Sequence, residues 1–215
     1  MRFFVDTANI EDIKSAFDLG IISGVTTNPV IIQREGTYDI KGQIAKIRAV
    51  CDGEIFTQVL GGTSGEMIEQ ARFIWSWDKN ITVKIPLNIE GIKAVSRLSK
   101  EGIRTCTTIV YTAAQAMAAA LAGASYAALF VNRSNAEGRD GFEFVETVTE
   151  LYRKNDIKTQ VLAASVNTPM DVVRVALAGV HVVTAPYRTW EDMIKNRSTD
   201  DTLESFLADW KGRTI

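Results

Sequence analysis

Short stretches of apolar and β-branched residues recur along the chain, and a longer segment with helical signals follows almost every one of them. This alternation constrains the fold more than any other feature, because it is typical of repeated βα units around a parallel sheet. The strands are predicted at residues 3–6, 24–26, 55–59, 82–85, 104–107, 126–131, 160–163 and 181–184. The alternative, a doubly wound open sheet, lacks support because no Gly-x-Gly-x-x-Gly motif follows the first strand.

The segments between the strands carry the residues that begin and end helices. Helices are predicted at residues 9–18, 38–50, 64–76, 90–100, 112–122, 141–154 and 169–178, and two more at 190–194 and 199–210 after the last strand. Several start with Thr, Ser or Asp, and Gly102, Gly123 and Gly179 stand where a helix must end. We therefore predict an α/β fold with one (β/α)8 barrel domain over residues 1–215, in which 189–215 form a C-terminal helical arm.

Composition excludes several classes of partner. The chain has 215 residues, of which 46% are hydrophobic and 23% are charged, so it can bury the core of one globular domain. The net charge is −2 and no run of Lys or Arg occurs, which argues against nucleic acid or a membrane surface as partner. The N-terminus does not resemble a signal peptide and no apolar run reaches a membrane-spanning length. We therefore expect a soluble, cytoplasmic protein.

Two cysteines and one histidine limit the nucleophilic and metal chemistry that the chain can support. Cys51 and Cys106 lie far apart in the sequence and belong to no disulfide framework, so we predict two free thiols. His181 stands in an apolar run without Cys or His at ligand spacing, and we interpret it as a structural residue near a strand start. No metal site and no Ser-His-Asp triad is predicted.

Polar residues gather at the predicted C-terminal ends of the strands. In a barrel these ends share one face, and the active site is built there. The residues at or just past a strand end are Asp6, Thr26, Asn28, Gln58, Lys84, Thr107, Thr108, Asn132, Arg133 and Ser165. We expect them to line one pocket.

Lys84 is the most unusual member of this set, because it interrupts the apolar strand Ile-Thr-Val-Lys-Ile-Pro. An amine that is withdrawn from water loses its proton more readily and can then condense with a carbonyl carbon. The alternative is a lysine on the outer face of the strand whose ammonium reaches solvent. From this residue alone, both readings remain open.

Asp6 ends the first predicted strand and is the candidate acid or base. A carboxylate close to an imine and to a substrate hydroxyl can accept a proton during carbon–carbon cleavage. Its alternative role is to cap the helix that begins near Ile10. Gln58 and Thr108 are neutral hydrogen-bonding groups that could jointly hold a water for proton transfer, or could be ordinary polar lining.

Six segments together resemble the small transaldolases and fructose-6-phosphate aldolases. They are Phe-Val-Asp-Thr-Ala-Asn (4–9), Gly-Val-Thr-Thr-Asn-Pro (24–29), Val-Lys-Ile-Pro (83–86), Ala-Gly-Ala-Ser-Tyr (122–126), Val-Asn-Arg (131–133) and Ala-Ala-Ser (163–165). They occur in the order and spacing of that family across essentially the whole chain. Each segment alone is a weak signal, whereas the ordered set is specific.

The resemblance implies a role for each matching residue. It implies that Lys84 forms the Schiff base, that Asp6 is the acid or base near the imine, and that Arg133 binds the phosphate of the sugar. The positions that match contacts of the dihydroxyacetone moiety or its surroundings are Thr26, Asn28 and Ser165, and those that match the holders of a catalytic water are Gln58 and Thr108. The resemblance also implies a mechanism without metal or cofactor.

The family resemblance extends to assembly and to the reaction. It implies a homo-oligomer, with pentamers paired into decamers, in which a C-terminal helix at 199–210 packs on a neighbouring subunit. The implied reaction moves a three-carbon ketol unit from a ketose such as fructose 6-phosphate to an aldehyde such as glyceraldehyde 3-phosphate. The open alternatives are a lyase that releases free dihydroxyacetone and a non-catalytic barrel that binds a sugar or forms a ring.

Two positions give opposing indications about the branch of the family. Phe130 stands where lyase-type aldolases carry a tyrosine and transaldolases a phenylalanine, so the hydroxyl that would help release dihydroxyacetone is absent. Gln58 stands where transaldolases usually have glutamate and the aldolase branch has glutamine. We give Phe130 more weight because it bears on the release step, and we therefore predict transfer.

Asn167 departs from the family pattern at the anion site. Relatives carry a lysine or arginine there as a second cation for the phosphate, and the loss of an ion-pair partner in a partly desolvated pocket costs about 2–3 kcal/mol. Two hypotheses follow. Arg133, with Arg139 or Arg188, could bind a singly charged sulfonate such as that of 6-deoxy-6-sulfofructose, or Arg139 or Arg188 could replace the missing cation for a phosphate.

Overall fold

Eight parallel strands close into a barrel in sequence order, as the alternation of elements predicts. The computed structural model describes residues 1–211 and 213. The strands are β1 (Arg2–Asp6), β2 (Ile22–Thr26), β3 (Glu54–Gln58), β4 (Ile81–Pro86), β5 (Thr105–Val110), β6 (Tyr126–Phe130), β7 (Gln160–Ala164) and β8 (Val182–Ala185). Because β1 pairs with both β2 and β8, the sheet has no open edge, and the doubly wound alternative is wrong.

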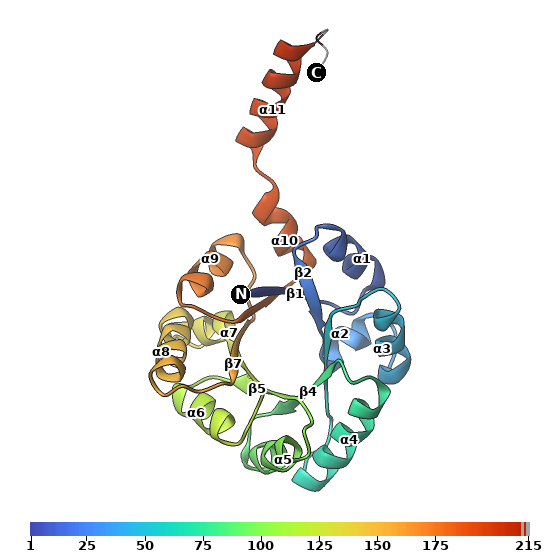
Figure 1. Cartoon of the computed structure of the whole chain (residues 1–215), viewed down its shortest axis with the longest axis vertical. Coiled ribbons are helices and arrows are strands. Elements are labelled where there is room, and N and C mark those ends of the chain that lie inside the picture. The colour runs from blue at the N-terminus through green and yellow to red at the C-terminus, as the bar shows by residue number, and fades with distance from the viewer. Residues whose placement is uncertain (212, 214–215) are drawn as a thin grey trace.

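Helices surround the barrel, as Figure 1 shows. The helices that the sequence predicts between the strands are all present: α1 (Ile10–Asp18), α3 (Ile40–Arg48), α4 (Ser64–Trp77), α5 (Ile89–Lys100), α6 (Ala113–Leu121), α8 (Gly141–Lys154) and α9 (Pro169–Leu177). The tail adds α10 (Tyr187–Ile194) and α11 (Arg197–Trp210), so the first tail helix starts three residues earlier than predicted. The barrel with helices between its strands confirms the (β/α)8 prediction.

Two short helices were not predicted, α2 (Pro29–Arg34) and α7 (Val131–Ala136). The start of α2 does carry a sequence signal, because the Asn28 side chain accepts a hydrogen bond from the Ile31 amide and Pro29 occupies the first helical position. The start of α7 has no side-chain cap, and Val131, predicted as the end of a strand, is its first residue. Both helices begin at the C-terminal end of a strand and so border the mouth of the barrel.

Local sequence fixes where the longer helices start and stop. Reciprocal capping boxes join Thr63 to Glu66 and Thr112 to Gln115, which satisfies amide groups that have no partner inside the helix. The predicted turn at Gly123 has a φ of 89°, and a Cβ there would meet the Ser99 side chain. These signals hold each helix directly after the strand that precedes it.

The barrel interior changes in character from one end to the other. Near the N-terminal ends of the strands, the buried Glu54 accepts hydrogen bonds from Arg2 (3.2 Å), Tyr126 (2.8 Å) and Thr82. An apolar layer follows, in which the Phe56 ring lies edge-on to the Tyr126 ring at 5.0 Å. The lower interior is therefore filled, and space remains at the C-terminal ends of the strands.

The cysteine and histidine predictions agree with the structure. Cys51 and Cys106 are both free and buried. The Nδ1 atom of His181 accepts a hydrogen bond of 3.1 Å from the Val161 amide, and burial lowers the pKa of this histidine. A neutral ring that accepts a backbone hydrogen bond next to β8 is the structural role expected from the sequence.

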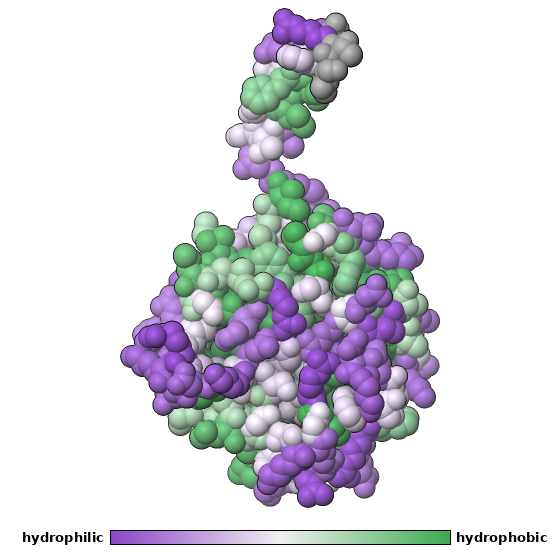
Figure 2. Space-filling view, in the orientation of Figure 1, coloured by the Kyte–Doolittle hydropathy of each residue, from purple (hydrophilic) through white to green (hydrophobic). Residues whose placement is uncertain are grey.

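The C-terminal helix α11 extends away from the barrel (Figure 1). All of its residues are exposed, including the large apolar side chains of Leu203, Phe206, Leu207 and Trp210. Figure 2 shows green, hydrophobic surface on the projecting arm beside white and purple surface. Over the part of the chain that the structure describes, no helix combines the length and apolar character needed to cross a bilayer.

Candidate active site

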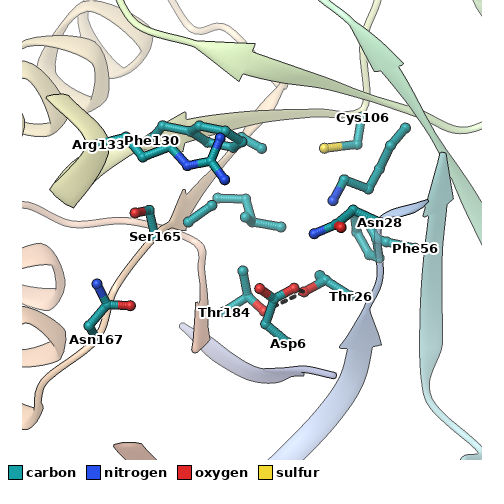
Figure 3. Close-up of a pocket in the computed structure, with 14 residues that line it drawn as sticks. Asp6, Thr26, Asn28, Phe56, Cys106, Phe130, Arg133, Ser165, Asn167 and Thr184 are labelled. Atoms are coloured by element: carbon teal, nitrogen blue, oxygen red, sulfur yellow. Dashed lines mark hydrogen bonds between the residues drawn. The ribbon is translucent and has the colours of Figure 1, made fainter. Parts of the chain in front are cut away.

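A cavity of about 180 Å³ lies among the C-terminal ends of the strands. The predicted residues that line it are Asp6, Thr26, Asn28, Lys84, Phe130, Arg133, Ser165 and Asn167. In Figure 3, the guanidinium of Arg133 lies across the cavity from the Asp6 carboxylate. The structure therefore brings together most of the side chains that strand ends indicated, although they are distributed over the whole sequence.

Lys84 lies inside this cavity on β4. Its side chain is 8% exposed, and its Nζ atom donates a hydrogen bond of 2.8 Å to the carbonyl oxygen of Thr27, just past the end of β2. That carbonyl belongs to a buried residue whose hydroxyl donates to the Phe56 carbonyl at 2.8 Å. The outward-facing alternative for Lys84 does not fit this placement, and the amine is available to a molecule in the cavity.

Asp6 is hydrogen-bonded to Thr26, and through it to Thr184, rather than to a helix terminus. Its Oδ1 accepts a hydrogen bond of 2.6 Å from the Thr26 hydroxyl, and Thr26 Oγ1 lies 2.6 Å from Thr184 Oγ1. The cap of α1 is Asn9, whose side chain accepts from two amides of the first turn. The capping alternative for Asp6 is therefore wrong, and its carboxylate belongs to the cavity (Figure 3).

Asn28 and Ser165 place polar groups on two further sides of the cavity. Asn28 uses its side-chain oxygen to cap α2, which fixes the orientation of its amide. Ser165 follows β7 with a φ of 57°, an uncommon conformation for a residue with a side chain, and its carbonyl accepts a hydrogen bond from Asn132. Backbone of this kind is often found at functional sites, where surrounding contacts stabilise it.

Two aromatic rings in contact lie between two arginines at one side of the mouth. The Arg133 guanidinium lies over the Phe130 ring at 4.9 Å, and the Phe130 ring meets the Tyr111 ring edge-on at 5.7 Å. Arg139 lies over the other ring, 5.4 Å from the Tyr111 centroid, and donates to the Tyr111 carbonyl at 3.3 Å. Arg139 also pairs with Glu137. Of these two arginines, Arg133 lines the cavity and Arg139 does not.

Arg188 and Asn167 occupy different places. Arg188 lies in a separate hollow with Asp12 and Tyr187, and its guanidinium is 3.6 Å from the Asp192 carboxylate. Asn167 lines the cavity, where its backbone amide donates to Asp171. Among the described cavity residues, Arg133 and Lys84 are therefore the cationic side chains, and Arg188 contributes none of its atoms to the lining.

A comparison of the sequence with known protein families gives a match over nearly the whole chain. The profile of the family described as transaldolase/fructose-6-phosphate aldolase matches residues 3–213. The chain belongs to this family.

Relatives of similar length support the assignment. A probable transaldolase of Clostridium botulinum (strain Loch Maree / Type A3) is 44% identical over 211 residues, which cover 98% of this chain and 97% of the relative. A probable transaldolase of Caldicellulosiruptor saccharolyticus is also 44% identical, with the same coverage. The similarity therefore extends over the barrel and its C-terminal arm alike.

Solved structures of low sequence identity share the fold. A thiamine phosphate pyrophosphorylase from Pyrococcus furiosus superimposes with a TM-score of 0.63 at 14% identity, covering 90% of this chain and 93% of that one. A putative fructose-1,6-bisphosphate aldolase from Coccidioides immitis gives a TM-score of 0.57 at 12% identity, with coverage of 100% and 80%. These likenesses establish the barrel and nothing about the reaction.

Gln58 and Thr108 lie beside the cavity of this transaldolase-family barrel without lining it. Strand register pairs Gln58 with Lys84, and Thr108 with Pro86, two residues after Lys84. Gln58 borders another hollow, between α3 and α4, and Thr108 is 1% exposed. Ile109, directly after Thr108, has a φ of 65° although it is β-branched, and the pairing of β5 with β6 shifts register there. The role of Gln58 and Thr108 in holding a water stays a prediction.

Several lining residues were not singled out from the sequence, namely Phe56, Cys106, Ala128, Leu162, Ala164 and Thr184. Most are apolar members of the inner layer and could not be recognised from residue type. Burial raises the pKa of the Cys106 thiol to about 12, so this cysteine is a neutral wall of the cavity. Thr184 is polar and lies one residue before the end of β8, where the predicted strand 181–184 ends, so the strand-end rule applied to the last unit would have found it.

Proposed function

We propose that the protein is a class I transaldolase, which transfers a three-carbon dihydroxyacetone unit from a ketose to an aldehyde through a Schiff base on Lys84. The observation that carries this proposal is the placement of the Lys84 amine inside the cavity that Asp6 also lines. The family membership and the names of the relatives support it. The acceptor that we propose is an aldehyde such as glyceraldehyde 3-phosphate.

The first step uses the neutral amine of Lys84. It attacks the C2 carbonyl of the ketose, and uptake of one proton from solvent with loss of one water gives a protonated imine between C2 and Nζ. The Thr27 carbonyl, 2.8 Å from Nζ, holds the amine in place without forming an ion pair. The hydroxyl-binding groups at Thr26, Asn28 and Ser165 are proposed to orient the three-carbon end of the sugar around this bond.

Asp6 is proposed to act in the second step. Its carboxylate takes the proton of the C4 hydroxyl while the C3–C4 bond breaks. The electron pair of that bond moves into the protonated imine, which becomes a neutral enamine on Lys84, and the remaining fragment leaves as an aldehyde. The acceptor aldehyde then reacts in the reverse sense, so that the enamine carbon attacks its carbonyl and Asp6 returns the proton to the new hydroxyl.

Hydrolysis of the product imine completes the cycle. One water adds to C2 and the Lys84 amine leaves, which restores the free enzyme and releases the new ketose. Gln58 and Thr108, on the strands that flank β4, are proposed to hold this water. A neutral amide can position a water but cannot take its proton, so in this proposal the proton goes to Asp6, which releases it to solvent and is again a carboxylate.

The far end of the ketose is proposed to carry an anion bound by Arg133. This guanidinium is held over the Phe130 ring and faces the cavity (Figure 3). Asn167 provides no second charge, which leaves a phosphate and a singly charged sulfonate as the two candidate tails. Rates with fructose 6-phosphate and with 6-deoxy-6-sulfofructose, each with the same aldehyde acceptor, decide between them, and a clear preference for the phosphate ends the sulfonate hypothesis.

Borohydride trapping tests the Schiff base directly. The protein is incubated with a ketose donor, reduced, and examined by mass spectrometry for a covalent three-carbon adduct on Lys84. Lys84→Arg keeps the positive charge and Lys84→Met keeps the volume, and neither can form the imine, so both are expected to give no adduct and no transfer. A wild-type protein without adduct contradicts the proposal and leaves a sugar-binding or ring-forming barrel as the alternative.

A second assay, of triose formation, separates transfer from simple cleavage. A transferase consumes the donor only while an aldehyde acceptor is present, whereas a lyase releases free dihydroxyacetone without one. Triose formation is measured with and without added acceptor. The absence of a hydroxyl at Phe130 favours transfer, and release at equal rates in both conditions would assign the lyase reaction instead.

A further inference from the structure

Three oxygen atoms at the wall of the cavity form a hydrogen-bonded chain. Asp6 Oδ1, Thr26 Oγ1 and Thr184 Oγ1 are separated by 2.6 Å and 2.6 Å (Figure 3). Thr26 and Thr184 are 2% and 3% exposed. They belong to β2 and β8, the two strands that pair with β1, so hydroxyls from both neighbours form a chain that ends on the carboxylate that β1 carries.

Counting protons fixes the direction of both hydrogen bonds. An ionised carboxylate only accepts, so the single hydroxyl proton of Thr26 points to Asp6. Thr26 has then no proton left for its other neighbour, and Thr184 must donate to the oxygen of Thr26. Two hydroxyl dipoles therefore point in the same sense toward the carboxylate, and bonds arranged in this way strengthen one another.

We propose that Thr184 is a positioning residue, which acts through Thr26 to hold Asp6 as an oriented, ionised carboxylate. Among the hydrogen bonds that the described residues make, Oδ1 of Asp6 is engaged by Thr26 while Oδ2 is left for a molecule in the cavity. Oδ2 is then the atom that takes the substrate proton. This inference rests on the proposed function, because it assigns a partner to the base of that reaction.

Other titratable side chains in the cavity could also affect the pH–rate profile, so the test must separate them from Asp6. The other titratable side chains that line the cavity are Lys84 on β4, Cys106 on β5 and Arg133 on α7. Cys106 stays protonated over the working range, since burial raises its pKa to about 12. Loss of the Thr184 hydroxyl leaves all three in place and changes only the chain of hydrogen bonds that ends on Asp6.

Thr184→Val removes the hydroxyl and keeps the shape of the side chain. We expect kcat to fall on the order of tenfold, KM to change less than about twofold, and the acidic limb of the pH–rate profile to move to higher pH by about half a unit. Thr184→Ser restores the hydroxyl and is expected to restore both values. Thr159→Val is the matched control, because Thr159 is also buried and uses its hydroxyl for a 2.7 Å bond to the Ala124 carbonyl, outside the cavity.

A second background shows whether Thr184 acts through Asp6. In Asp6→Asn, an added Thr184→Val is expected to lower kcat less than about twofold, because the group through which it acts is already lost. An equal loss in both backgrounds, or an unshifted acidic limb with wild-type kcat, overturns the inference. Borohydride trapping of the wild-type protein is run in parallel. A missing adduct shows that the proposed function fails, and this inference fails with it. Where the adduct forms normally, the results with the Thr184 variants test the role of Thr184 only.

Discussion

The Nζ atom of Lys84 lies 2.8 Å from the carbonyl oxygen of Thr27, so the candidate nucleophile is held by backbone rather than by a carboxylate. A carbonyl oxygen accepts a hydrogen bond from an ammonium and from a neutral amine alike. The amine can therefore lose its proton without losing its position. This separates the task of holding Lys84 from the task of moving protons, which falls to Asp6 in the proposed reaction.

Asp6→Asn tests that division of tasks. The amide has the shape of the carboxylate and can still accept the Thr26 hydrogen bond, but it cannot take the proton of a hydroxyl. We expect kcat to fall about 10²- to 10⁴-fold, the usual contribution of a general base. Because the imine still forms, borohydride should trap the whole donor on Lys84 instead of the three-carbon fragment. Turnover within about fivefold of wild type would assign the base elsewhere.

Phe130→Tyr tests the balance between transfer and release. Phe130 lines the cavity between the Tyr111 ring and the Arg133 guanidinium, so an added hydroxyl would enter a site where it can protonate the enamine. We expect free dihydroxyacetone formed without acceptor to rise by at least about tenfold. Phe130→Leu, which adds no hydroxyl, controls for loss of the ring. Unchanged release in the tyrosine variant would show that position 130 does not decide this step.

Much of the fold and part of the site follow from the sequence because both depend on local patterns. Alternating strands and helices predict the barrel, and a lysine inside an apolar strand predicts an unusual amine at Lys84. The strand-end rule then brings Asp6, Thr26 and Ser165 to the same face. These inferences need only the chain direction and the common geometry of parallel strands.

The remaining site features depend on relations between distant segments. The hydrogen bond from Thr26 to Asp6 and the stack of Arg139 on Tyr111 involve residues whose side-chain directions no local pattern defines. Gln58 lies at the end of a barrel strand, yet it borders a hollow between α3 and α4 and does not line the cavity. Sequence reasoning therefore identifies the strand ends and leaves the directions of their side chains to the structure.

The two arginines on either side of the Phe130 and Tyr111 rings predict a graded response at the anion end. Arg133→Gln should raise KM for a donor with an anionic tail by about 30- to 100-fold, since it removes a charged hydrogen bond. Arg139→Gln removes the contacts with Tyr111 and should raise this KM several-fold, whereas Arg188→Gln should leave it unchanged because Arg188 pairs with Asp192 outside the cavity. D-Fructose, which lacks the anion, is the matched donor. An equal KM change with fructose would contradict an anion-specific role.

Alkaline pH should weaken the fold through Tyr126 and Cys106. Burial raises the pKa of each to about 12, so the folded protein keeps protons that the unfolded chain loses near its ordinary values. Stability from these groups is complete below about pH 8.5 and is lost as pH rises toward about 12, because the folded state then binds more protons than the unfolded state. Urea unfolding between about pH 8 and pH 10.5 measures the decline. Cys106→Ala should make it shallower, and an identical slope in both proteins would exclude the thiol as a cause.

The exposed face of α11 predicts that the C-terminal arm binds a neighbouring copy of the chain. Leu203, Phe206, Leu207 and Trp210 recur at helical spacing and are all exposed, and burying such a side chain stabilises by about 1.5–3 kcal/mol. We expect an oligomer, proposed as pentamers paired into decamers, by light scattering after size exclusion. Leu203→Glu with Phe206→Glu should reduce its mass toward the 23.7 kDa of one chain. Ser205→Glu adds charge on the opposite face and should leave the mass unchanged, because that face is not the one proposed to be covered. A wild-type monomer, or an assembly that the double variant leaves intact, would contradict this role for the arm.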